Sequence, residues 1–160
     1  MRLDTIKNTL VILEEVVLKP MKLLFISDTA SITGLTKMFE NDYAELFQFI
    51  GANQLHSDKI MAFYLKYENP LTVDVAVAVD RLPAQLMGRV RSKIIDGGNA
   101  LVAHYTGSYE KMDAPYNEIS NWVKDNNRQA RGLPFEVYLK NPTSIKNRSE
   151  LRTDIYQMLD

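Results

Sequence analysis

The stretch LPFEVYLKNP, residues 133–142, sets a carboxylate beside an aromatic ring on a predicted strand. Successive strand side chains point to opposite faces, so Glu136 shares a face with Tyr138 while Phe135 and Val137 lie on the other. An acid next to a tyrosine can bind a cation or transfer a proton. Two interpretations are open: Glu136 is a solvated residue on a half-exposed strand, or it is a pocket acid.

An internal comparison favours the pocket acid. The letters YLK at 64–66 recur at 138–140, an offset of 138 − 64 = 74 residues. The same offset aligns Glu136 with Ala62, so the fold alone does not demand an acid there. A buried carboxylate is costly unless it is hydrogen-bonded or meets an opposite charge. The two tyrosines of the repeated motif would supply hydroxyl groups, and a ligand cation would supply the charge.

The elements that position these residues are predicted to occur twice in the same order. The first half has predicted strands at 11–18, 21–27, 59–67 and 71–79 and a helix at 34–50; the second has strands at 90–95, 99–106, 135–140 and 150–159 and a helix from Asp113, as N-cap, to 125. We expect the two strands before each helix to pair as a hairpin. The predicted fold class is α+β: tandem duplicated β-α-β-β units with pseudo-twofold symmetry, antiparallel sheets with helices on one face, and a central ligand groove.

This organisation predicts one domain over residues 1–160, with repeat halves at about 11–80 and 89–160 that superpose. Phe135, Val137 and Leu139 are expected to contact the helices. Glu136 would then face the opposite way or into the groove between the halves. About ten residues precede the first strand, which is too few for a helix-turn-helix, so no DNA-binding segment is predicted.

Composition bounds the function. With 46% hydrophobic and 24% charged residues, the chain of 160 residues has a globular composition. Its net charge is 19 − 20 = −1 with dispersed basic residues, which argues against direct nucleic-acid binding. It has no cysteine, no secretory signal pattern and no apolar run long enough for a bilayer, so a cytoplasmic protein without membrane contact is expected.

Other candidate residues carry weaker signals. His56 and His104 stand far apart without acids at ligand spacing, so neither a metal site nor a cofactor is predicted. Tyr105 and Tyr109 flank the turn into the second helix, where they frame the groove or pack its entrance. Trp122, near the end of that helix, belongs to the core or rim, or else serves as a ligand platform.

Three segments of the second half match a known family in order and spacing. They are AHYTGSYEKMDAPYNEISNWV (103–123), GLPFEVYLKNP (132–142) and ELRTDIYQML (150–159). On these motifs the chain resembles the GyrI-like, or bacterial transcription activator effector-binding, family as a stand-alone member. The resemblance implies a tandem β-α-β-β pair in a curved eight-stranded antiparallel arrangement, whose groove binds amphipathic or cationic molecules. It also implies that Glu136 is the pocket acid.

The leading interpretation is a small-molecule binding module for an amphipathic, cationic aromatic ligand. Its predicted ligand-binding residues are Glu136, Tyr138, Tyr64, Tyr105, Tyr109 and Trp122. The alternative is a hydrolase of strained electrophilic small molecules, with Glu136 and Tyr109 as the catalytic pair. A second alternative is a protein-interaction module of the gyrase-inhibitor type. The sequence leaves a protein partner and a homodimer open.

Overall fold

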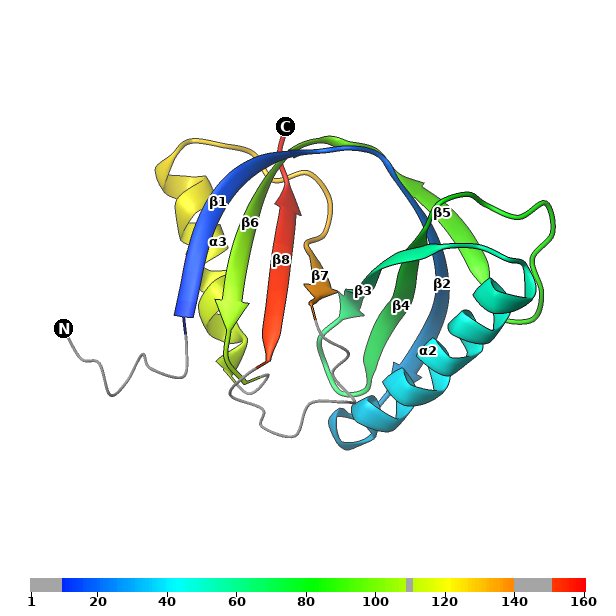
Figure 1. The fold of residues 1–160 in the computed structure, drawn as a ribbon. Helices are drawn as coiled ribbons and strands as arrows, with labels where there is room; N and C mark the ends of the chain where they lie inside the picture. Colours follow the sequence, from blue (N-terminus) through cyan, green and yellow to red (C-terminus); the bar gives the residue numbers. More distant parts are fainter. Residues whose placement is uncertain (1–9, 109–110, 140–150) are drawn as a thin grey trace. The chain divides into compact units, whose positions relative to one another are not determined.

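The computed structural model describes residues 10–108, 111–139 and 151–160. The chain divides into two compact units (Figure 1). Unit 1 lies within Met1–Leu18 and Gly98–Asp160, and unit 2 is Lys19–Gly97. Each unit is an antiparallel sheet with a helix, which confirms the predicted α+β class.

Unit 2 is a four-stranded antiparallel sheet with helix α2 packed on one face (Figure 1). Its strands follow the order β3-β4-β2-β5. The elements are β2 (Met21–Ala30), the short 3-10 helix η1 (Ile32–Gly34), α2 (Leu35–Ala52), β3 (Ser57–Lys66), β4 (Leu71–Val79) and β5 (Arg91–Ile95).

The sequence of unit 2 explains these elements. β4 reads LTVDVAVAV, and all but one of its nine residues are buried, as expected for a strand rich in valine between two neighbours. The buried residues of α2 recur at three- and four-residue steps and are Met38, Phe39, Asp42, Tyr43, Leu46 and Ile50. The hydroxyl of Tyr43 donates to the carbonyl oxygen of Met61 on β3 over 2.7 Å, which ties the helix to the sheet. The helix ends at Ala52 rather than Ile50.

Unit 1 has the strand order β1-β6-β8-β7, with α3 packed on one face (Figure 1). Its elements are β1 (Leu10–Leu18), β6 (Gly98–Thr106), α3 (Asp113–Asp125), β7 (Phe135–Tyr138) and β8 (Arg152–Met158). The core beneath α3 consists of Leu101, Ala103, Tyr105, Ile119, Ile155 and Leu159. Met112 is the N-cap of α3, so the predicted cap Asp113 is instead its first residue.

The two predicted hairpins were wrong. β1 pairs with β6, and β2 pairs with β4 and β5, so neither β1 with β2 nor β5 with β6 forms a hairpin. The connection between β1 and β2 is Lys19-Pro20, and proline cannot adopt the positive φ that tight two-residue hairpin turns favour. The first strand of each predicted repeat therefore joins the unit that holds the rest of the other repeat.

Strand order and register nevertheless recur between the units. The order β3-β4-β2-β5 corresponds to β7-β8-β6-β1. In unit 2, Ala62 pairs with Val75, and in unit 1 Glu136 pairs with Ile155 at the equivalent position. The contrast between Ala62 and Glu136 is thus a difference at one structural position. Superposition of the repeat halves stays a prediction.

Within the described ranges, none of the helices combines the length and the apolar character that crossing a bilayer requires.

Candidate functional site

Glu136 lies on the face of the unit 1 sheet that α3 covers. Cross-strand pairs form one row of Leu13, Ala103, Ile155 and Glu136, and the first three belong to or pack against the core beneath α3. The expectation that Glu136 faces away from the helix was therefore wrong. All four residues of β7 are buried, so hydrophobic alternation does not show which face meets the helix.

The opposite face of β7 carries two of the three apolar residues that were expected to contact the helix, so that expectation was wrong for Phe135 and Val137. The third, Leu139, lies just past the end of β7 and is exposed. Phe135 pairs with Tyr156, and their rings stack with centroids 5.3 Å apart. Val137 pairs with Asp154. Both apolar side chains are buried on this second face.

Two tyrosine hydroxyls hold the Glu136 carboxylate. The hydroxyl of Tyr116, near the start of α3, donates to Oε2 over 2.6 Å. The hydroxyl of Tyr138, two residues along β7, donates to Oε1 over 2.7 Å. Each carboxylate oxygen thus has its own donor, while the Glu136 residue is only 4% exposed.

Burial raises the pKa of Glu136 above its ordinary value, and the two tyrosine hydrogen bonds oppose that rise by stabilising the anion. The ion pairs formed among the described residues do not include Glu136. The site therefore presents a buried acid with two hydroxyl donors and no protein cation among those described. Such a group can accept a cation or exchange a proton with a bound molecule.

Tyr116 was not among the predicted site residues. Tyr116 and Ile119 lie three residues apart on one face of α3, where the ring of Tyr116 packs against the core beneath the helix. Its hydroxyl reaches Glu136 across a separation of 20 residues. The signal that could have found it is the first-turn position after Pro115, which sets a long polar-tipped side chain over the neighbouring strands.

Two other predicted residues lie in the core of unit 1. Tyr105 is 1% exposed, and its hydroxyl donates to the carbonyl oxygen of Ser108 over 2.6 Å. Trp122 is half-buried against the core beneath α3, and the guanidinium of Arg128 lies 5.8 Å from its ring centroid. Both residues pack the helix onto the sheet.

The remaining two predicted residues are placed differently. Tyr64 belongs to unit 2, where it pairs with Val73 and stacks on Tyr67 with ring centroids 5.4 Å apart. By register it stands at the position that Tyr138 holds in unit 1. Tyr109 lies outside the described residues. Within unit 1, Glu136, Tyr138 and Tyr116 thus form the assembled site.

His104 has a role that sequence spacing did not reveal. Its Nδ1 lies 2.9 Å from Oδ1 of Asp154, and its Nε2 lies 2.8 Å from Oε1 of Glu14. Burial alone would lower the pKa of His104, but the hydrogen bonds and charges of the two acids outweigh burial and raise it. The three residues come from β6, β8 and β1, so their meeting depends on the strand order.

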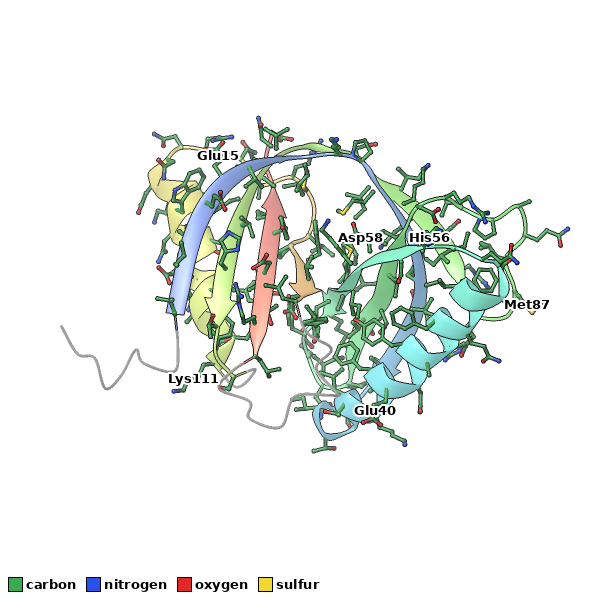
Figure 2. All side chains as sticks on the ribbon, viewed as in Figure 1. Glu15, Glu40, His56, Asp58, Met87 and Lys111 are labelled. Carbon is green, nitrogen blue, oxygen red and sulfur yellow. The ribbon has the colours of Figure 1, made fainter. Side chains whose placement is uncertain are left out.

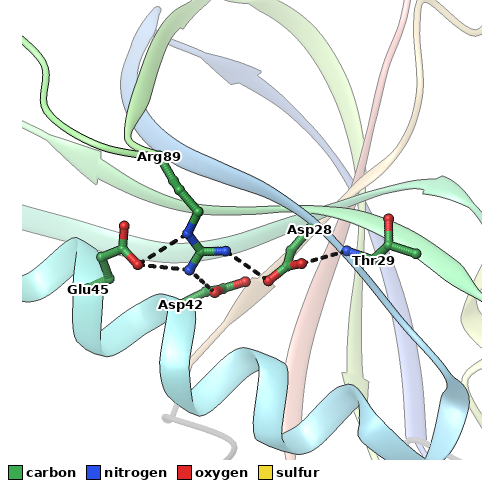
Figure 3. A network of polar contacts seen from close by, with 5 residues as sticks. All are labelled: Asp28, Thr29, Asp42, Glu45 and Arg89. Atoms are coloured by element: carbon green, nitrogen blue, oxygen red, sulfur yellow. Dashed lines mark hydrogen bonds and ion pairs between the residues drawn. The ribbon is translucent and has the colours of Figure 1, made fainter.

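A second polar cluster holds α2 in unit 2 (Figure 3). Arg89 donates to Asp42 over 2.7 Å, to Glu45 over 2.8 Å and to Asp28 over 3.1 Å. Burial and a hydrogen bond with Asp28 raise the pKa of Asp42 to about 6, although Arg89 works against that shift. The three acids raise the pKa of Arg89. The cluster fastens the loop after β4 to the helix.

The described residues contain no group of three or more histidine, aspartate or glutamate side chains that could hold a metal ion. His56 lies just before β3 (Figure 2), and its backbone N–H donates to Oδ1 of Asp80 over 2.9 Å. The His56 residue is exposed.

Comparison with solved structures finds the same fold in several proteins. The cryo-EM structure of an EcmrR–DNA complex matches with a TM-score of 0.77 and 16% identity; the match covers 98% of this chain and 59% of that one. This chain therefore spans about 59% of the length of that chain. The crystal structure of the EcmrR C-terminal domain matches with a TM-score of 0.69 and 17% identity, covering 95% of this chain and 98% of that one.

Two further neighbours are a protein solved with a bound ligand and a hydrolase. SAV2435, solved bound to tetraphenylphosphonium, matches with a TM-score of 0.63 and 13% identity over 93% of this chain and 94% of that one. A hydrolase from Listeria innocua matches with a TM-score of 0.67 and 10% identity over 92% of this chain and 91% of that one. At these identities the likeness concerns the fold.

Comparison of the sequence with curated proteins finds no significant match. The model of the GyrI-like small molecule binding domain, in contrast, matches residues 13–160, which is nearly the whole chain. Those residues include most of β1, strands β2 to β8, helices α2 and α3, and the Glu136 site. With the sequence motifs, the α+β fold and the family model in agreement, this chain belongs to the GyrI-like family of small-molecule binding domains.

Proposed function

We propose that this protein binds an amphipathic, cationic aromatic small molecule and that Glu136 is the acid that accepts its charge. The observation that carries the proposal is a carboxylate 4% exposed, held by two tyrosine hydroxyls. Taking a carboxylate out of water is unfavourable, and two neutral donors offset only part of that cost. A cation close to Glu136 would offset much of the rest.

The aromatic rings beside the acid suit a cation with apolar substituents. Tyr116 and Tyr138 each donate a hydroxyl hydrogen bond to the acid, so two aromatic side chains are in contact with the carboxylate. A cation near the face of a tyrosine ring gains about 0.5 to 2 kcal/mol, depending on how fully it is desolvated. Tetraphenylphosphonium, the ligand of the structural neighbour SAV2435, has this chemistry and is a reasonable first probe.

Titration of tetraphenylphosphonium into the native and Glu136→Gln proteins tests the proposal. The amide keeps the size of the side chain but removes its charge, so binding should weaken by about 1.5 to 3 kcal/mol. Triphenylphosphine oxide is a neutral analogue and should bind both proteins equally. Glu40→Gln makes the same change on the exposed side of α2 (Figure 2) and should leave both affinities unaltered. Equal cation affinity for the native and Glu136→Gln proteins would refute the charge role.

Hydrolysis of a strained electrophile is the second candidate function. An acid with a raised pKa and two hydroxyl donors is equipped to take a proton from water and to return one to a leaving oxygen. The Listeria innocua hydrolase among the neighbours shares the fold. Under this alternative, Glu136→Gln would retain the affinity for a neutral epoxide and lose its hydrolysis, as measured by product formation.

A further inference from the structure

The ammonium group of Lys93 lies among acidic and aromatic side chains on the face of the unit 2 sheet opposite α2. We call this cluster the ammonium cage: Lys93 on β5, Asp74 on β4, Phe63 on β3 and Phe25 on β2. The strand register explains why these side chains lie together. Phe63 on β3 and Ser27 on β2 both pair with Asp74, so the three side chains lie on the same face of the sheet. Four strands contribute one cage residue each.

The Lys93 ammonium contacts both kinds of group that bind organic cations, a carboxylate and the faces of aromatic rings. Its Nζ lies 3.2 Å from Oδ2 of Asp74, 4.0 Å from the Phe63 ring centroid and 4.6 Å from the Phe25 ring centroid. Ser27 Oγ donates to the other oxygen, Oδ1, which fixes the carboxylate. One oxygen therefore faces the cation beside two ring faces, which attract cations through their quadrupoles.

The aromatic walls are specific to unit 2. Asp154 stands in unit 1 at the register position of Asp74, since each pairs with the strand on either side in the same way. The residues at the positions of the two phenylalanines are aliphatic, Val102 and Val137. Both units thus have the acid, but only unit 2 has phenylalanines beside it. The strand order and register do not require those aromatic residues, so the cage is a feature of this sequence.

Lys93 can leave the cage at modest cost. β5 is the last strand in the order, and the Lys93 side chain is 31% exposed. Its four-carbon stem is flexible and its ammonium is strongly hydrated in water. Asp74, by contrast, is 6% exposed and would be left buried without a cation. Any departure of Lys93 therefore favours entry of another cation.

We propose that the ammonium cage is a second cation-binding subsite, which Lys93 occupies until an organic ammonium ligand displaces it. The class of ligand is an alkyl- or arylalkylammonium small enough to lie between two phenylalanine rings and a carboxylate. Because Lys93 is tethered at the site, it sets a threshold that only a cation with additional contacts overcomes. This subsite is separate from Glu136 and does not depend on its role.

Acylation of lysines in the native protein tests displacement directly. Benzyltrimethylammonium is the probe, because a quaternary amine does not react with acetic anhydride, and mass spectrometry gives the modification of each lysine. Lys93 should react slowly with acetic anhydride when the probe is absent, and severalfold faster when the probe is present at a saturating concentration. Lys59 is the internal control, since it has a similar exposure and an ion pair with Asp58. The Glu136→Gln protein should respond identically, which separates this subsite from the proposed pocket acid.

Chemical rescue tests the cage without its occupant. The atoms that Lys93→Ala removes from the side chain correspond to one molecule of n-propylammonium. Added n-propylammonium should therefore bind in their place and raise the melting temperature of the variant in a saturable way. The neutral control n-propanol should not. Lys59→Ala should show no such response, and Asp74→Asn should abolish the acylation response. If Lys93 reacts equally with and without the probe and propylammonium does not rescue Lys93→Ala, the lysine is a fixed structural ion pair. Should Lys93→Ala fail to fold, the acylation result alone decides.

Discussion

The hydroxyl of Tyr116, near the start of α3, lies 2.6 Å from Oε2 of Glu136 on β7. This contact joins the helix of unit 1 to the acid on its sheet. Any change in the charge of Glu136 therefore acts directly on a group that helps to hold the helix in place.

Tyr116→Phe should lower the free energy of unfolding by about 1.5 to 3 kcal/mol at neutral pH, the range for hydrogen bonds that involve a charged group. The ring, which packs on the core beneath α3, is retained. Urea unfolding measures the change. The loss should shrink at acidic pH, where Glu136 is protonated in both proteins; a loss independent of pH would mean that the hydroxyl does not act on the Glu136 charge.

Glu136→Gln should leave the melting temperature unchanged or raise it. Burial of this carboxylate raises its pKa, so the charged form costs stability at neutral pH, and neutralising it removes that cost. Thermal unfolding followed by circular dichroism measures the effect, with Glu40→Gln as the exposed control. A clear fall in melting temperature for Glu136→Gln alone would show that the apo fold uses the charge.

Stability should fall as the pH rises from about 4 to 6 because of Asp42. Its pKa is raised from 3.8 to about 6 in the folded chain, so over this window the folded state holds a proton that the unfolded state has released. A shift of this size corresponds to a cost on the order of 3 kcal/mol, which is reached about one pH unit above the folded pKa. Asp42→Asn should flatten the stability profile in this window; a profile as steep as the native one would contradict the assignment.

His104 should contribute stability at acidic pH that is lost as the pH rises through its folded pKa. That pKa is raised above 6.5 by Glu14 and Asp154, so the folded state binds the proton more tightly than the unfolded state. With the side chain one-third exposed, the contribution should be about 0.5 to 1 kcal/mol. His104→Gln should lose it below pH 6 and resemble the native protein above pH 8, as urea unfolding at the two pH values would show.

Local patterns predicted the elements well, because they depend on neighbours in sequence. The valine alternation of β4 and the apolar spacing of α2 gave those elements to within two residues. Which strands pair with one another was harder to predict from the sequence. Whether β1 bonds to β2 or to β6 depends on contacts about ninety residues away, such as Ile12 with His104. Local alternation carries no information on that choice.

The candidate site likewise combines contacts that are local in sequence with one that is not. Glu136 and Tyr138 were found because they lie two residues apart on one strand, and the contrast with Ala62 is visible in the sequence itself. Tyr116 comes from a helix, and its contact depends on which face of β7 that helix covers. Since β7 is buried on both faces, only the three-dimensional packing decides.

The proton balance of cation binding tests the central claim most directly. If Glu136 accepts the charge of a ligand, tetraphenylphosphonium should bind more tightly as the pH rises through the raised pKa of Glu136, releasing a proton in that range. Isothermal titration in buffers of different ionisation enthalpy measures the proton release. The native protein should release a proton that Glu136→Gln does not. Equal proton release and equal affinity in the two proteins across this pH range would contradict the account.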